Sequence, residues 1–305
     1  MSFPPKTDFW QVGLVPAPLP ALLEPGSLAG QRERIVWLPD PGPWRYLADP
    51  FGLQRHGRTH VFVEAFDYRT KHAVIEHHEL DANLTWLGQA TVLARPFHLS
   101  YPFIVEDGGE VFMIPESQKH GEIALYHARK FPGDWVRETP LLSGVRGAEA
   151  SVIRHRDIWW MFFTVVGPQA RDQRELHLAH AERLTGPWRL HPLNPVLTDR
   201  AGARPGGTPF VGADGCVTLP VQDCSRTYGG AVRFLRFATL EPTRIVAEHL
   251  PFRITGDMVS PTHRDGLHTF SACGNLTLLD TKRVTRSVAR YGVDLRRRIR
   301  RLVAV

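Results

Sequence analysis

Residues 48–65 have the sequence ADPFGLQRHGRTHVFVEA, in which two short apolar segments are joined by a tight polar turn at Gly57. Such a turn is a strong local signal for a β-hairpin, because Gly, Asn and Asp adopt positive φ angles at little cost. The same pattern recurs four more times, with turns around Gly108, Asp157, Gly215 and Gly266. The intervals between successive turns are 51, 49, 58 and 51 residues. The chain therefore carries five copies of one turn-and-strand unit.

The first four copies each contain segments for four strands. The strands before the turns begin near residues 48, 100, 149, 207 and 259. After the turn come a second strand, a third such as AVIEHHEL (73–80), and an edge-like fourth such as ATVLARP (90–96). Four strands per unit at a period near 50 residues are typical of propeller blades. We therefore predict an all-β fold, a five-bladed β-propeller that spans residues 1–280.

The fifth copy is incomplete at its C-terminal end. It has a candidate third strand, NLTLLDT (275–281), but no fourth strand of its own. An unpaired sheet edge invites association with other chains, so folds usually cover it. We predict that the N-terminal segment FWQVGLVPAP (9–18) supplies the missing strand and closes the ring.

Residues 281–305 form a basic tail that we predict to be an amphipathic helix. Apolar residues recur three or four positions apart, at Val284, Val288, Tyr291, Leu295, Ile299 and Leu302. Two interpretations remain open. The apolar stripe packs on the propeller while the arginines are solvated, or the helix docks on an anionic membrane surface or an acidic partner.

The overall composition is that of a soluble globular protein, with 43% hydrophobic and 22% charged residues. The net charge is +6, but residues 282–301 alone hold nine basic residues and one acid, which leaves the body at about −2. A nucleic-acid partner is therefore not expected. No apolar run is long enough to cross a membrane, and the first residues, MSFPPKTDFW, do not resemble a secretory signal. We expect a cytoplasmic protein.

No metal or other cofactor is expected. The three cysteines lack the spacing of a zinc site or a disulfide framework. The sequence EHHE at residues 76–79 places His77 and His78 next to each other. Consecutive residues of a strand point to opposite faces, so these two side chains do not chelate one ion together.

Polar residues gather where the blades converge. The innermost strands of a propeller meet at its axis, and the residues near their starts are Asp49, Ser100, Tyr101, Glu149, Arg204, Ser260 and His263. The second strands add Glu116, Gln222, Asp223 and His268. Carboxylates bind sugar hydroxyls, and a pair of them shares acid and base roles when one is kept protonated. The axial pocket is therefore predicted to bind a carbohydrate.

An ordered set of motifs resembles one known family. The motifs are ADPF, LSYPF, VFMIPES, TGPWRLHPLNPV, ARPGG, VQDCSRTYGGAV and GLHTF. They are similar to the glycosyl-hydrolase-like propeller at the N-terminus of plant glucosamine inositolphosphorylceramide transferases, which in bacteria occurs alone or fused to formyltransferase-like domains. The resemblance covers roughly residues 8–280 and extends to the furanosidase clan of glycoside hydrolase families 43, 32 and 68.

The resemblance implies roles for three positions. Asp49 matches the blade-one Asp, which is a general base or a nucleophile, and Glu149 falls where the clan has an Asp that tunes pKa and orients the sugar. The clan's general acid is a Glu that opens blade four, where this chain has Arg-Pro-Gly-Gly at 204–207. The acid then comes from elsewhere, with Glu116 as the first candidate and Asp223 as the second. Alternatively, Arg204 holds a carboxylate or phosphate of the ligand.

Two functions from different classes follow from these observations. The first is a carbohydrate-active enzyme that cleaves or transfers a glycosyl unit, with Asp49, Glu116 and Glu149 at its centre and a carbohydrate or glycolipid as substrate. Tyr101, Arg204, Gln222, Asp223, His263 and His268 are its candidate substrate-binding residues. The second is a non-catalytic sugar-binding or scaffold propeller that presents substrate to a partner transferase or formyltransferase.

Overall fold

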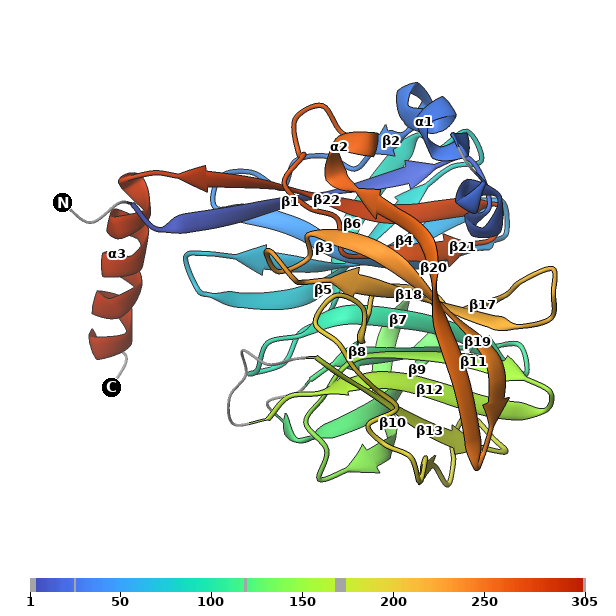
Figure 1. Ribbon diagram of the computed structural model, residues 1–305. Helices are drawn as coiled ribbons and strands as arrows, with labels where there is room; N and C mark the ends of the chain where they lie inside the picture. Colours follow the sequence, from blue (N-terminus) through green and yellow to red (C-terminus); the bar gives the residue numbers. More distant parts are fainter. Residues whose placement is uncertain (1–3, 25, 118–119, 168–173, 304–305) are drawn as a thin grey trace.

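The structure is a computed structural model that describes residues 4–24, 26–117, 120–167 and 174–303. Five antiparallel sheets form the blades of a β-propeller, and most of their strands are labelled in Figure 1. The five-bladed fold predicted from the turn repeat is confirmed. In the part of the chain that the structure describes, no helix has the length and apolar character needed to cross a bilayer.

Blades one to four each come from one continuous stretch of chain. Blade one contains β3 (Arg45–Arg55), β4 (Arg58–Asp67), β5 (His72–Leu80) and β6 (Trp86–Leu93). Blade two contains β7 (Ser100–Asp107), β8 (Glu110–Glu116), β9 (Glu122–Lys130) and β10 (Gly133–Ser143). Blade three contains β11 (Gly147–His155), β12 (Ile158–Val165), β13 (Glu175–Ala181), β14 (Arg189–Leu190) and β15 (Leu197–Thr198). Blade four contains β16 (Arg204–Pro205), β17 (Phe210–Val211), β18 (Val217–Asp223), β19 (Ala231–Glu241) and β20 (Arg244–Thr255).

Blade five is built from both ends of the chain. Its strand order from the axis outward is β21 (Phe270–Cys273), β22 (Leu276–Arg286), β1 (Lys6–Val15) and β2 (Val36–Trp37). The N-terminal strand β1 pairs with β22 over ten residue pairs, from Lys6↔Arg286 to Val15↔Thr277. The N-terminal segment is thus the third strand of the blade, and β2 is the fourth.

Our assignment within blade five needs correction. The expected turn at Gly266 is not the hairpin turn, which lies at Gly274 and Asn275 between β21 and β22. The expected inner strand near residue 259 is instead the end of the short helix α2 (Gly256–Val259) followed by a loop. The segment NLTLLDT is therefore the second strand of the blade. A second turn signal, CGN at 273–275, was present eight residues downstream of the one we selected.

A separate apolar core fills each space between neighbouring blades. The strand β12 contains the continuously apolar run IWWMFF, because both of its faces are covered by neighbouring blades. Trp160 and Phe162 pack toward blade four, whereas Met161 and Phe163 pack toward blade two. Alternate residues of a strand point to opposite faces, so a strand covered on both sides needs apolar residues at every position.

The remaining helices lie near the chain ends. They are the 3-10 helices η1 (Leu19–Leu23) and η2 (Arg32–Arg34), and the α-helices α1 (Ser27–Gln31) and α3 (Ala289–Val303). The C-terminal helix α3 stands at one side of the propeller, beside the N-terminal end of β1 (Figure 1). It begins at Ala289, so the predicted boundary at residue 281 falls inside β22. Lys282 is accordingly buried in the sheet and does not belong to an exposed basic tail.

Candidate functional site

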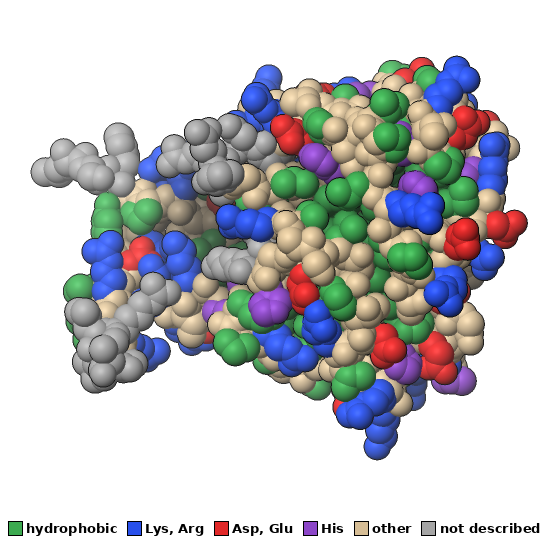
Figure 2. Space-filling model, turned by 90° about the horizontal axis from the view of Figure 1, so that it is seen from below, with side chains coloured by type: hydrophobic (Ala, Val, Ile, Leu, Met, Phe, Trp, Pro, Cys, Tyr) green, Lys and Arg blue, Asp and Glu red, His purple; other side chains and the backbone are tan. Residues whose placement is uncertain are grey.

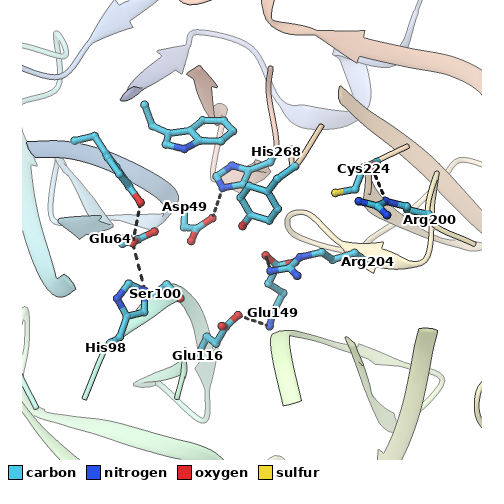
Figure 3. Close-up of a pocket in the computed structure, with 13 residues that line it drawn as sticks. Asp49, Glu64, His98, Ser100, Glu116, Glu149, Arg200, Arg204, Cys224 and His268 are labelled. Atoms are coloured by element: carbon cyan, nitrogen blue, oxygen red, sulfur yellow. Dashed lines mark hydrogen bonds and ion pairs between the residues drawn. The ribbon is translucent and has the colours of Figure 1, made fainter. Parts of the chain in front are cut away.

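A cavity of about 510 Å³ lies at the axis and is lined by residues from all five blades. Figure 3 shows these side chains gathered around one space. Four carboxylates face it, together with three aromatic rings, two arginines and two histidines. The lining residues are Trp10, Tyr46, Asp49, Glu64, His98, Ser100, Glu116, Glu149, Arg200, Arg204, Cys224, Tyr228 and His268.

Inner-strand residues at the same position in blades one, two and three share an unusual backbone conformation. Asp49, Tyr101 and Glu149 have φ angles of 50°, 45° and 54°. Each lies at a break in strand register, between Ala48/Phe51, Ser100/Phe103 and Ala148/Ser151 respectively. A β-bulge of this kind redirects a side chain, and positive φ at a non-glycine residue costs about 1–3 kcal/mol. Such strain is typical of functional sites.

The residue paired with the start of each bulge supplies a second set of polar groups. Ala48 pairs with Glu64 on β4, and Ser100 pairs with Glu116 on β8. The sequence analysis selected Glu116 but missed Glu64. The signal was available, because both residues lie seven positions after a turn glycine, Gly57 or Gly109, in the related segments VFVEA and VFMIPE.

Asp49 is buried and held by three donors. Its Oδ1 accepts a hydrogen bond from the Thr269 hydroxyl at 3.0 Å, and its Oδ2 accepts one from the backbone N–H of Tyr101 at 3.2 Å. His268 Nε2 lies 3.4 Å from Oδ1. Burial raises the pKa of Asp49 to about 6, although His268 and the Thr269 hydroxyl act in the opposite direction. Asp49 is therefore mostly ionised at neutral pH and readily protonated just below it.

His268 connects Asp49 to a further buried carboxylate, Asp280, which the sequence analysis missed. The Nδ1 atom of His268 lies 2.7 Å from Asp280 Oδ2, and its ring stacks on Trp10 with centroids 3.9 Å apart. Burial alone lowers the pKa of His268, but the Asp280 and Asp49 carboxylates outweigh it and the net pKa is raised. An imidazolium at this position stabilises the ionised form of Asp49.

Ligand atoms of Asp49, His268 and Asp280 lie within 4.8 Å of one another, which is close enough for a metal site. However, both Asp280 oxygens already accept backbone N–H groups: Oδ1 those of His268 and Thr269, and Oδ2 that of Asp49. Oδ2 also takes the contact with His268. These hydrogen bonds explain why the three side chains lie together, because they join them into an Asp–His–Asp chain.

Glu149 is neutralised by the residue that replaces the expected blade-four acid. Arg204 Nε and Nη2 each donate to one Glu149 oxygen at 2.7 Å, and Gln222 Nε2 donates to Glu149 Oε2 at 2.6 Å. Burial lowers the pKa of Arg204, but the Glu149 carboxylate raises it. The net pKa of Arg204 is well above its ordinary value. The bidentate edge of Arg204 is thus occupied within the protein. A ligand carboxylate or phosphate has no access to this edge.

Glu116 and Glu64 are carboxyl groups whose pKa values are raised by burial. Glu116 Oε2 accepts the backbone N–H of Glu149 at 3.1 Å. Burial raises the pKa of Glu116 to about 8, with Glu149 and Asp49 adding to the effect and Arg204 opposing it. Burial also raises the pKa of Glu64 well above its ordinary value, and the Asp49 and Glu116 carboxylates contribute. The cavity therefore contains protonated and ionised carboxyl groups at the same pH.

The predicted site residues separate into three groups. Asp49, Glu116, Glu149, Arg204 and His268 line the axial cavity. Tyr101 and Gln222 are fully buried behind it, where the Tyr101 hydroxyl donates to Gly207 O and accepts from Gly207 N. Asp223 and His263 do not reach the cavity.

The structure places the last two residues away from the axial cavity for simple geometric reasons. Asp223 follows Gln222 on β18 and so points to the other side of the strand, where it lines a shallow hollow with Arg253. His263 lies in the loop after α2 and lines a different, more apolar cavity with Trp44 and Arg283. Its placement failed because blade five was assigned to the wrong turn.

The two glycines of the ARPGG motif serve close packing between blades four and five. Gly207 has a φ of 148° and forms an isolated bridge with Phe270. A Cβ atom on Gly207 would collide with the Phe270 carbonyl, and one on Gly206 would lie 2.7 Å from the His268 carbonyl oxygen. The motif thus brings two inner strands together and fixes Arg204 beside Glu149.

The fold and the cavity define a five-bladed β-propeller with a carboxylate-rich axial site. Similar solved structures include a family 117 glycoside hydrolase of Zobellia galactanivorans (TM-score 0.53, 15% identity, 78% of this chain and 84% of that one). A family 43 enzyme of Xanthomonas citri gives a TM-score of 0.54 at 14% identity, over 79% of this chain and 87% of that one. At such identities the likeness shows the fold alone.

The sequence comparisons assign the chain more closely. The family model "Glucosamine inositolphosphorylceramide transferase 1, N-terminal" matches residues 40–268, and the chain belongs to this family. A transferase of that name from Oryza sativa subsp. indica is 31% identical over 251 residues, which cover 76% of this chain and 33% of the relative. The Arabidopsis thaliana transferase is 26% identical over 268 residues, 80% of this chain and 34% of the relative. The chain spans about a third of the length of these relatives.

Proposed function

We propose that this protein is a carbohydrate-active enzyme that cleaves or transfers a glycosyl unit in the axial cavity. The fold and the family support a carbohydrate-related function. The observation that carries the finer proposal is the split in protonation between Glu116 and Asp49. Burial raises the pKa of Glu116 to about 8, whereas that of Asp49 is about 6. Environments that push two carboxyl groups apart in this way assign the acid and the base.

The chemistry assigns one role to each group. Glu116 gives its proton to the glycosidic oxygen as the bond to the anomeric carbon breaks, so that the leaving group departs as a neutral alcohol. Asp49 acts on the other side of that carbon, either as nucleophile or as the base that removes a proton from the attacking hydroxyl. His268 and Thr269 position Asp49 and stabilise its charge. Glu149 is held by Arg204 and Gln222 and orients the sugar.

The names of the relatives suggest the class of substrate. They name a transferase of glucosamine and inositolphosphorylceramide, and the phosphoryl group of the second compound is anionic. Arg200 at the cavity is the cation available for such a group. It is exposed, and its Nε donates to the Cys224 carbonyl. A cytoplasmic location remains a prediction.

Substitution at Asp49 and Glu116 tests the proposal. The assay uses nitrophenyl glycosides of xylose, arabinofuranose, galactose and glucosamine, with inositol phosphate as an added acceptor. Asp49→Asn should lower turnover on the order of 10³-fold. Glu116→Gln should slow substrates with poor leaving groups far more than nitrophenyl glycosides, which need little protonation. Unchanged turnover of an active substrate by Asp49→Asn would refute the assignment.

A second function, a non-catalytic sugar-binding propeller that partners a transferase, is favoured by one specific observation. The expected blade-four acid is an arginine that neutralises Glu149. This function predicts that glucosamine inositol phosphate binds in calorimetry and that no glycoside in the panel is turned over. Under the enzyme proposal, Asp49→Asn instead keeps sugar binding and loses turnover.

A further inference from the structure

The C-terminal helix α3 attaches to the propeller through two of its arginines, and several of its apolar residues face solvent. The Arg290 guanidinium lies 4.2 Å from the centre of the Tyr68 ring, and Arg297 Nη1 donates to the Tyr68 carbonyl at 3.0 Å. Asp294 pairs with both arginines, at 3.2 and 2.7 Å. Positions 290, 294 and 297 therefore form the face that attaches the helix. A helix that packs on a core normally attaches through its apolar side.

The opposite face of α3, with the residue that precedes it, carries four exposed apolar side chains. They are Val288, Tyr291, Leu295 and Ile299, with exposed fractions of 72%, 47%, 59% and 51%. Single exposed apolar residues are common on protein surfaces and need no explanation. These four lie three or four positions apart and so form one continuous stripe. The interpretation that the stripe packs on the propeller is therefore wrong.

Positive charge flanks this stripe. Arg296, Arg298 and Arg300 are exposed, and Figure 2 shows basic side chains (blue) together with apolar ones (green) at the left edge of the molecule, where α3 stands. A second copy of the helix would place these arginines against each other, which disfavours self-association. Apolar anchors flanked by arginines match an anionic membrane surface, where the arginines meet lipid headgroups and the apolar side chains enter the interface.

We propose that the exposed face of α3, formed by Val288, Tyr291, Leu295 and Ile299 with Arg296, Arg298 and Arg300, docks on an anionic membrane. This inference does not rest on the proposed enzymatic function. The helix lies outside residues 40–268, the part of the chain that matches the family model.

Docking through α3 brings the axial cavity close to the membrane. Tyr46 lines the cavity, and its ring stacks on Phe66 with centroids 4.8 Å apart. Phe66 and Tyr68 belong to the small apolar cluster that Val293 of α3 also contacts. The helix and the rim of the cavity thus share one cluster of side chains. A lipid headgroup in the docked state lies on the side of the propeller where the cavity begins.

Vesicle co-sedimentation of the full chain tests the docking. The protein should bind vesicles of equimolar phosphatidylcholine and phosphatidylserine, but not vesicles of phosphatidylcholine alone, and about 1 M salt should release it. The double variant Leu295→Ser/Ile299→Ser should bind at least about tenfold more weakly. The triple variant Arg296→Gln/Arg298→Gln/Arg300→Gln should lose on the order of 100-fold, because each basic residue near an anionic surface contributes about fivefold.

Matched controls distinguish binding through this face from nonspecific adsorption to vesicles. Leu190→Ser/Leu193→Ser removes two leucines that are each 52% exposed in blade three. Arg156→Gln/Arg183→Gln/Arg189→Gln removes three exposed arginines from the same blade. Both variants should bind like the unmodified protein, and all variants should keep its melting temperature. The proposal is overturned if the α3 variants bind vesicles normally. It is also overturned if the protein ignores anionic vesicles and the stripe instead mediates self-association or capture of an acidic protein.

Discussion

Single residues at the axis combine strain with burial of charge. Asp49 and Glu149 hold left-handed backbone angles that non-glycine residues seldom adopt, and both carboxylates are almost completely buried. Neither feature stabilises a propeller by itself. The surrounding hydrogen bonds from Thr269, Tyr101 and Gln222 maintain both carboxylates in position. A site that costs stability and is nevertheless fully supported by its neighbours is typical of catalysis or tight binding.

The protonated carboxyl of Glu116 makes stability depend on pH. Burial raises the pKa of Glu116 to about 8 in the folded protein, from an ordinary 4.5. The folded state therefore binds more protons than the unfolded state between about pH 4.5 and 8, and stability falls as the pH rises through this window. Glu116→Gln should remove this part of the pH dependence, worth a few kcal/mol. Urea unfolding of both proteins at pH 5, 6 and 8 measures it.

Asp49 supplies the internal control for that measurement. Its pKa of about 6 also exceeds its ordinary value of 3.8, so it destabilises the folded protein between about pH 4 and 6. Glu116→Gln should keep the loss of stability between about pH 4 and 6 and should remove the loss between about pH 6 and 8. An identical loss of stability between pH 6 and 8 in both proteins would contradict a protonated Glu116.

At the level of elements, the contact of β21 with the two glycines that follow β16 fixes the arginine that replaces the expected acid. Gly207→Ala should destabilise the protein by about 1–3 kcal/mol, because the added Cβ would collide with the Phe270 backbone at a positive φ. Gly88→Ala is the matched control, since no atom lies within 4 Å of its added Cβ. Thermal unfolding compares the two. Equal stability of both variants would show that the close approach of the blades is not required.

The elements also show where sequence reasoning succeeds. Hairpin turns at Gly57, Gly108 and Asp157 were found because a tight turn needs residues that accept positive φ, which is a local requirement. The role of β1 as the third strand of its blade was not predictable in this way. Its pairing with β22 joins residues more than 260 positions apart, and the choice between Gly266 and Gly274 as the turn depends on that pairing.

The candidate site was predictable to the same extent. Asp49, Glu116 and Glu149 were found because the blade repeat places equivalent positions together at the axis. The attachment of Glu149 to Arg204 was missed because it depends on side-chain contacts between blades three and four. Asp280 was missed as well, because its buried position at the axis depends on the correct strand assignment in blade five.

For the molecule as a whole, closure of the ring through β1 is the structural requirement. Deletion of residues 1–15 should abolish the cooperative unfolding transition, because it exposes the edge of β22 and removes the Trp10 ring that covers His268. A synthetic peptide of residues 5–16 should restore the transition when added to the truncated chain. Circular dichroism monitors both experiments. A truncated chain that melts like the intact protein would show that four and a half blades suffice.

The whole molecule therefore presents a closed ring of blades, an axial cavity with carboxyl groups in two protonation states, and a helix beside its rim. The protonation states are the basis of the proposed chemistry, and they do not require a known substrate to be measured. Carbon-13 NMR titration of the Glu and Asp carboxyl groups, assigned with Glu116→Gln and Asp49→Asn, should show midpoints of about 8 for Glu116 and about 6 for Asp49. Midpoints near the ordinary values of 4.5 and 3.8 for the two groups would contradict the acid and base roles assigned to them.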